Sequence, residues 1–177
     1  PLPLVEGPNG VLLVGEHDAG SGSGKITVLI PRVMGGWITK APMPVNLLDA
    51  GSAVVGGKLH VIAGKDGVGP KKIMRIYDPV ANNWSVGVET PAGYPAVENP
   101  AAAELNGKLY LFGGSQEPFA GAVANAAVFD PVTGQWTELA PMPTARGGAT
   151  AKALNGKIYV VGGMSSDGVS LSTVEVY

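Results

Sequence analysis

Two histidines, fourteen carboxylates and no cysteine limit the chemistry that this chain of 177 residues could perform. Glu16, His17 and Asp18 form the densest group of possible metal ligands. Adjacent side chains at a strand end diverge, so we expect no metal there. His17 and His60 lie in different parts of the chain and neither has an identifiable nucleophile, which leaves no Ser-His-Asp arrangement to argue. Without cysteine there are no disulfides and no thiolate metal ligands.

The glycine-rich stretch from Asp18 to Ile26 looks like a phosphate-binding loop at first sight. That pattern requires glycine where Ala19 stands and serine or threonine where Ile26 stands, and it should open a helix. Here the stretch joins two apolar runs. We therefore interpret it as a flexible hairpin loop.

Acidic side chains leave one route to catalysis open. Paired carboxylates can work as general acid and base if they converge in space. The candidates are Glu16, Asp66, Glu98, Glu117 and Asp167. Nothing in the sequence shows that they converge.

A segment that occurs four times organises the chain: a tight turn, a short apolar run and then glycine. The copies are Asn9–Glu16, Gly56–Gly64, Asn106–Gly114 and Asn155–Gly163. Their apolar runs follow one another at intervals of 47, 50 and 49 residues. A fixed period of this size is typical of stacked structural repeats.

The copies share a common order of strands. A strand of small residues precedes the last three copies, a strand ending in Asp-Pro follows the second and third, and a tryptophan opens the final strand after the first three, at Trp37, Trp84 and Trp136. The unbroken apolar run Ile158–Val161 indicates a strand buried on both faces. We therefore predict an all-β fold of four-stranded antiparallel sheets around an axis, with the small-residue strand innermost and essentially no helix. His60 falls in a slot that holds tyrosine in two other copies, so we predict a packed histidine.

This pattern resembles the kelch repeat. The resemblance rests on Gly113-Gly114, Phe129-Asp130-Pro131 and Trp136 in one unit, and on Gly64, Tyr77-Asp78-Pro79 and Trp84 in another. It implies a kelch-type β-propeller with about three and a half four-stranded blades in this chain. We place a degenerate blade at roughly 1–41, full blades at 42–88 and 89–140, and one lacking its last strand at 141–177.

The number of blades departs from the family pattern, because propellers close with about four to eight. An open arc would expose apolar blade faces, which are an aggregation liability unless covered. We expect that remaining blades outside this chain, or further copies of it, complete the ring.

Variable loops on a rigid scaffold are where binding usually occurs. Here they share the face opposite the Asn-Gly and Asp-Pro turns. The candidate binding residues on that face are Glu16, His17, Asp18, Lys65, Asp66, Tyr94, Glu98, Gln116, Glu117, Phe119, Arg146 and Asp167. Tyr94 and Phe119 either offer aromatic contact surface or fold back onto their own loops. Arg146 either faces the axial channel or bonds neighbouring carbonyls.

The kelch resemblance implies a non-catalytic binding or scaffold module that contacts a protein partner through this loop face. The alternative from another class is a carbohydrate-active enzyme of the mutarotase type, with Arg146 and Glu98 at the channel mouth. A third is a building block of a larger particle. With 15% charged residues and no basic run, nucleic acid is a poor partner. We expect no cofactor and no membrane span, and composition leans slightly toward a secreted protein.

Overall fold

The computed structural model describes residues 5–6, 12–17, 24–29, 37–117 and 120–177. Within these ranges every regular element is a β-strand, so the predicted all-β class is confirmed. None of the described residues belongs to a helix that could cross a membrane. The chain divides into two compact units, residues 1–39 and 40–177.

The first unit contains one antiparallel sheet with strand order β1-β2-β3, formed by β1 (Val5–Glu6), β2 (Leu12–His17) and β3 (Gly24–Leu29). Trp37 was expected to open a further strand, but Trp37–Thr39 is not a strand in the structure. A strand needs a hydrogen-bonded neighbour, and no described residue pairs with this segment.

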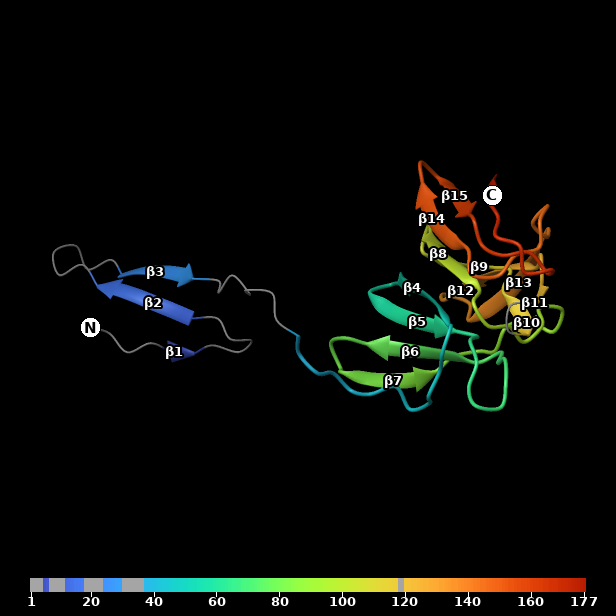
Figure 1. The fold of residues 1–177 in the computed structure, drawn as a ribbon. Coiled ribbons are helices and arrows are strands. Elements are labelled where there is room, and N and C mark those ends of the chain that lie inside the picture. The colour runs from blue at the N-terminus through green and yellow to red at the C-terminus, as the bar shows by residue number, and fades with distance from the viewer. Residues whose placement is uncertain (1–4, 7–11, 18–23, 30–36, 118–119) are drawn as a thin grey trace. The chain divides into compact units, whose positions relative to one another are not determined.

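The second unit contains three antiparallel sheets whose strands follow chain order (Figure 1). The first sheet comprises β4 (Gly51–Val55), β5 (Lys58–Ile62), β6 (Met74–Asp78) and β7 (Asn83–Val86). The second sheet comprises β8 (Ala101–Leu105), β9 (Lys108–Phe112), β12 (Ala126–Asp130) and β13 (Gln135–Leu139). The third sheet comprises β14 (Thr150–Leu154), β15 (Lys157–Val161) and β16 (Val174–Val176). A small hairpin, β10 (Ser115–Glu117) with β11 (Ala120–Ala122), lies within the long loop of the second sheet.

The turns between the first two strands of each sheet explain the repeated Asn-Gly pair. Asn106 and Gly107 have φ values of 52° and 75°, and Asn155 and Gly156 repeat them at 51° and 74°. Two successive positive φ values define the type I′ turn, whose twist matches antiparallel strands and which Asn-Gly favours. The sequence therefore sets the strand register at this point.

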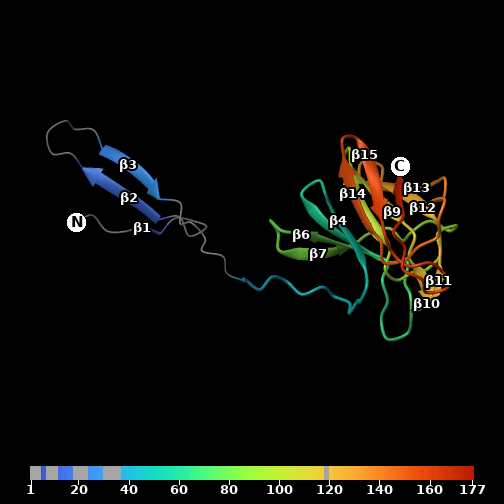
Figure 2. The same ribbon diagram turned by 45° about the horizontal axis from the view of Figure 1, so that its top comes forward.

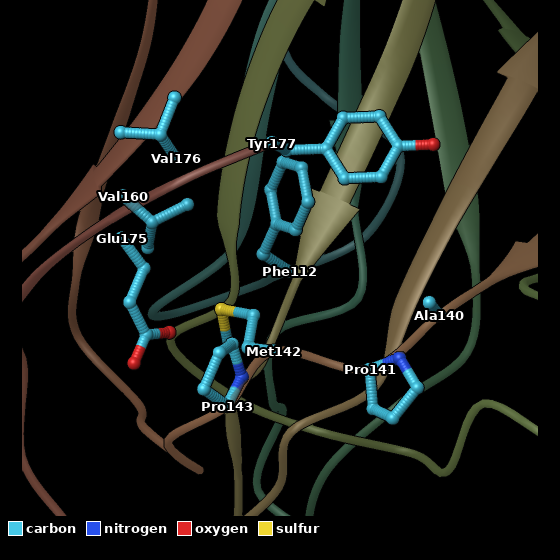
Figure 3. Close-up of a pocket in the computed structure, with 9 residues that line it drawn as sticks. All are labelled: Phe112, Ala140, Pro141, Met142, Pro143, Val160, Glu175, Val176 and Tyr177. Carbon is cyan, nitrogen blue, oxygen red and sulfur yellow. The ribbon is translucent and has the colours of Figure 1, made fainter.

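The small-residue strands β4, β8 and β14 form the inner layer of the three sheets, because β8 lies beside both β4 and β14 (Figure 1). Figure 2 shows β4 and β14 from a second direction. Leu109 and Leu111 of β9 pack against the first sheet, in a cluster with Ile62 and Met74. Phe112 of the same strand packs in the opposite direction, against the third sheet (Figure 3). The middle strand of the second sheet is thus buried on both faces. The run Ile158–Val161 of β15, for which this burial was predicted, is buried on one face only: Ile158 and Val160 are buried, whereas Val161 is 45% exposed, because no described sheet packs against its other face.

The glycine pair after each apolar strand lets neighbouring sheets approach closely. Gly114 donates its backbone N–H to the Arg146 carbonyl, and Gly64 donates in the same way to the Val97 carbonyl, both at 2.9 Å. Gly113 has φ +62°, and a Cβ placed there would overlap the Arg146 carbonyl oxygen. Only glycine satisfies both the conformation and the space.

Each tryptophan of an outer strand contacts the segment that leaves the preceding repeat. Trp84 donates its indole N–H to the Ala41 carbonyl at 2.9 Å, and Trp136 donates to the Val88 carbonyl at 3.4 Å. Ala41 and Val88 each stand four residues after the preceding tryptophan in the chain. Each indole also packs on the aromatic residue seven positions before it: the ring centroids are 5.1 Å apart for Trp84 and 5.3 Å apart for Trp136.

Candidate functional site

The loop face of the second unit is formed by the loops between the second and third strands and by the connections that enter each inner strand. An isolated bridge holds each connection against the loop of the same sheet. The bridges join Leu48 to Lys65, Glu98 to Ser115 and Gly147 to Met164. The repeated bridges give the loop face a regular backbone frame from which the variable side chains project.

A rim of main chain lies at the start of the three inner strands. Asp49, Asn99 and Gly148 each stand two residues before an inner strand and have φ values of 55°, 53° and 66°. The Asn99 N–H donates to the Asp49 carbonyl at 2.7 Å, and the Gly148 N–H donates to the Asn99 carbonyl at 2.8 Å. Sequence reasoning missed this rim, although Asp, Asn and Gly at equivalent positions are residues that tolerate positive φ.

Lys65 joins two carboxylates beside this rim. Its Nζ lies 2.7 Å from Glu98 Oε2 and 3.2 Å from Asp49 Oδ2. The Glu98 side chain is only 2% exposed, so Lys65 compensates a buried negative charge. Hydrogen bonds to Glu98 and then Asp49 raise the pKa of Lys65. The Lys65 ammonium is therefore suited to holding the rim together through its two ion pairs rather than to exchanging protons near neutral pH.

Asp66 closes the loop that follows Lys65. Its Oδ1 accepts hydrogen bonds from the N–H groups of Val68 at 2.8 Å and Gly69 at 3.2 Å, and it lies 3.0 Å from Lys71 Nζ. The Val68 N–H and the Lys71 ammonium hold the pKa of Asp66 below its ordinary value. In the third sheet, the Ser165 hydroxyl donates to Asp167 and is the largest cause of its lowered pKa. Both carboxylates stay ionised near neutral pH and order their own loops.

Tyr94 does not offer a contact surface on the loop face. Its side chain is 1% exposed, and its hydroxyl donates to the Gly113 carbonyl at 2.7 Å. Burial raises the pKa of this phenol. The connection around it is also fixed to the second sheet, because the Gly93 N–H donates to Glu138 Oε1 at 2.8 Å. Tyr94 therefore fills the core beneath its own long connection, the second of the two expected arrangements.

Arg146 is buried, and its guanidinium bonds neighbouring carbonyls, the second of the two arrangements expected for it. One terminal nitrogen of its guanidinium donates to the carbonyls of Gly162 and Thr173, each at 3.0 Å. The other lies 2.9 Å from Glu175 Oε1. Arg146 and Glu98, which the carbohydrate-active alternative would place together at the channel mouth, each bind a different partner. The planar fork of the guanidinium suits this role as a clamp within the third sheet.

The remaining candidates are dispersed or lie beyond what the structure describes. Gln116 and Glu117 are exposed on the β10 hairpin. Glu16 and His17 end β2, and their side chains are not among those described; Asp18 and Phe119 lie outside the described residues.

His60 is 3% exposed with its ring 6.2 Å from that of Phe129, and burial lowers its pKa. The prediction of a packed histidine is confirmed. No group of three or more His, Asp or Glu side chains that could hold a metal occurs among the described residues.

Two adjoining hollows on the loop face form what we name the loop-face groove. They have volumes of about 480 and 470 Å³ and lie between the 45–48 connection and the 65–68 loop. Leu48 and Val68 line the groove with 64% and 91% of their surfaces exposed. Asp66 and Lys71, which form an ion pair, line the same hollow as Val68. The groove thus presents apolar side chains with a charged margin.

Residues 98–143 and 145–177 match the family model of the kelch motif. This chain is a kelch-repeat protein. The two matched ranges contain the second sheet and the third sheet, where the glycine pairs and the aromatic residues before the turn are most regular.

Curated relatives with kelch names cover most of this chain. It is 35% identical over 130 residues to Kelch-like protein 25 of Xenopus tropicalis, across 72% of this chain and 21% of the relative. It is 29% identical over 140 residues to Kelch-like protein 35 of Mus musculus, across 78% and 22%. It is also 31% identical over 131 residues to N-acetylneuraminate epimerase of Pasteurella multocida, across 71% and 33%. The kelch-repeat chain therefore spans about a fifth to a third of the length of these relatives.

Proposed function

We propose that this kelch-repeat chain is a non-catalytic binding module whose loop-face groove receives a protein partner. The observation that carries the proposal is the exposure of two large apolar side chains, Leu48 and Val68, one in each of the two adjoining hollows of the loop-face groove. Apolar side chains grouped on an otherwise polar surface are typical of interaction sites. The margin of Asp66 and Lys71 would orient the partner rather than supply most of the affinity.

The state of the charged side chains supports binding over catalysis. Glu98 is neutralised by Lys65, Arg146 is bound to carbonyls and to Glu175, and Asp66 closes its own loop. A general acid or base has to reach the substrate with a pKa near the working pH. The described loop-face carboxylates whose pKa values shift, those of Asp66 and Asp167, shift downward. These contacts favour a scaffold with a recognition surface.

The relative named N-acetylneuraminate epimerase supports the carbohydrate-active alternative. In this chain it would need Arg146 and Glu98 beside one ligand, and their present contacts do not favour it. The two functions differ in a simple readout: the enzyme would bind and convert a free sugar, whereas the module would bind a polypeptide.

A displayed library of random peptides tests the proposal, because such a library samples many polypeptide surfaces at once. We expect selected peptides to bind the intact chain and to lose at least tenfold in affinity to a Leu48→Ser/Val68→Ser variant. Val132→Ser is the matched control, because Val132 is equally exposed but lies in the Asp-Pro turn on the opposite face. Peptides that bind the double variant unchanged, or a glycan array that returns a sugar bound through Arg146, would contradict the proposal.

A further inference from the structure

Two turns of the repeat have the same four residues and the same backbone conformation. Leu105–Lys108 and Leu154–Lys157 both read Leu-Asn-Gly-Lys. The asparagine φ values are 52° and 51°, and the glycine φ values are 75° and 74°. Each turn joins the first strand of its sheet to the second, β8 to β9 and β14 to β15, in the same register. Any difference in reactivity between the two asparagines therefore comes from residues outside these four.

An asparagine followed by glycine can lose its side-chain amide by a reaction within the chain. The backbone nitrogen of the glycine attacks the asparagine Cγ, so that a new N–C bond forms, the C–NH₂ bond breaks and ammonia leaves with the backbone proton. The resulting succinimide ring takes up one water and opens to aspartate or isoaspartate. Glycine permits the attack because it has no Cβ to hinder the close approach. The reaction requires the backbone N–H to give up its proton, because the deprotonated nitrogen is the nucleophile.

Both turns are open to the water that the second step consumes. Asn106, Gly107, Asn155 and Gly156 are all exposed. A Cβ placed on either glycine would meet no atom within 4 Å. Access of water therefore does not distinguish the two turns.

The two turns differ at the residue three positions before the glycine. In the second sheet this residue is Glu104, whose Oε1 accepts the Gly107 N–H at 2.8 Å. In the third sheet it is Ala153, whose side chain has no acceptor. Glu104 stands opposite Leu109 and Ala153 stands opposite Ile158, so the two residues occupy the same place in their hairpins. A carboxylate thus holds the proton that has to leave in one turn, and none does so from this position in the other.

Glu104 opposes the reaction at Gly107 in two ways. A carboxylate that accepts an N–H forms a charge-assisted hydrogen bond, which has to break before the nitrogen can attack. The carboxylate also repels the negative charge that deprotonation leaves on the nitrogen. Water around the exposed turn weakens both effects, so the expected difference in rate is severalfold rather than many orders of magnitude.

We propose that Asn155 is a site of spontaneous deamidation and that Glu104 protects Asn106, the equivalent asparagine of the second sheet. The reaction adds one negative charge to a chain whose formal net charge is −2. In the isoaspartate product the main chain runs through Cβ, which adds a carbon to a two-residue turn. The length of such a turn sets the strand register. Deamidation at Asn155 therefore disturbs the β14–β15 hairpin as well as the surface charge.

Peptide mapping by mass spectrometry measures the reaction at each asparagine separately. The folded natural chain is incubated at mildly alkaline pH, and the mass gain from exchange of NH₂ for OH is followed with time. We expect Asn155 to react at least about threefold faster than Asn106. In urea the difference should disappear, because the identical four-residue sequences then decide the rate. A third Asn-Gly pair, Asn9-Gly10, lies outside the described residues and gives a separate peptide.

Exchanging the two distinguishing residues assigns the difference to the carboxylate. Glu104→Ala should raise the rate at Asn106 to that of Asn155, and Ala153→Glu should lower the rate at Asn155 to that of Asn106. Both positions are exposed, so the folded state should tolerate the changes. Glu117→Ala is the matched control, because it removes an exposed carboxylate from the β10 hairpin and should change neither rate.

Three results would overturn the proposal. The first is an equal rate at the two asparagines of the folded natural chain, and the second is a Glu104→Ala variant in which Asn106 stays slow. The third is an Asn155 that keeps its amide in the folded chain while the unfolded chain loses it, since the folded turn would then block the attack. Circular dichroism of each variant confirms that the rates compared are those of folded chains.

Discussion

Replacing Arg146 should destabilise the kelch-repeat chain strongly, because its guanidinium neutralises Glu175 inside the third sheet. The Arg146 side chain is 0% exposed in this pair and that of Glu175 is 14% exposed. Arg146→Met keeps much of the volume but leaves the Glu175 carboxylate nearly buried and without its partner. Removing one partner of a buried ion pair costs about 3–5 kcal/mol. Part of this cost comes from the Gly162 and Thr173 carbonyls, which each lose a charged donor at 3.0 Å.

Urea unfolding at one fixed protein concentration measures this effect. The second variant is Arg146→Met/Glu175→Leu, which removes the orphaned charge and should recover about half of the lost free energy of unfolding. Lys152→Met is the matched control, because Lys152 is an exposed cation on the same sheet; we expect it to stay within about 0.5 kcal/mol of the natural chain. If Arg146→Met unfolds within about 1 kcal/mol of the natural chain, or if the double variant is the less stable of the two, the clamp interpretation is refuted. Unchanged stability combined with lost ligand binding would instead place Arg146 in a binding site.

Two further measurements test the core and the close approach of the sheets. Burial lowers the pKa of His60, so the unfolded chain takes up a proton more readily than the folded one. This contribution to stability is fully present above the ordinary pKa of about 6.5 and is lost as the pH falls below it; chemical unfolding between pH 7.5 and 5 should show this loss, and His60→Gln should remove it. Gly113→Ala should cost about 2–4 kcal/mol, because positive φ and the overlap of a Cβ with the Arg146 carbonyl oxygen act together. Gly107 also has a positive φ, +75°, but a Cβ placed there would meet no atom within 4 Å. Gly107→Ala should therefore lower the free energy of unfolding by only about 1–2 kcal/mol in a thermal melt. Equal losses of stability in the two variants would contradict the steric argument.

The strand order was predictable because each strand carries its own local signal. Asn106-Gly107 sets a type I′ turn, and the unbroken apolar run after it requires burial on both faces. Repetition of these signals at near-constant spacing made the prediction of stacked sheets secure. Trp37 holds the repeat position of a strand but forms none, because a strand needs a neighbouring edge to pair with and no described residue pairs with this segment.

The loop face was less predictable because its contacts join residues distant in sequence. Arg146 and Tyr94 look like ligands by residue type, yet one bonds carbonyls of the third sheet and the other the Gly113 carbonyl. Lys65 was identified as a candidate binding residue, but its ion-pair partner Asp49 was not. No local sequence pattern indicates an ion pair between residues of two different loops.

The rim formed by Asp49, Asn99 and Gly148 depends on main-chain hydrogen bonds. Backbone groups are the same whatever side chain is attached, provided that the residue tolerates a left-handed conformation. Loop residues outside the Asp49–Lys65–Glu98 ion pairs can therefore be exchanged without loosening the junctions between sheets. This separation makes the chain a suitable framework for grafting foreign recognition loops, with asparagine, aspartate or glycine kept at the three rim positions.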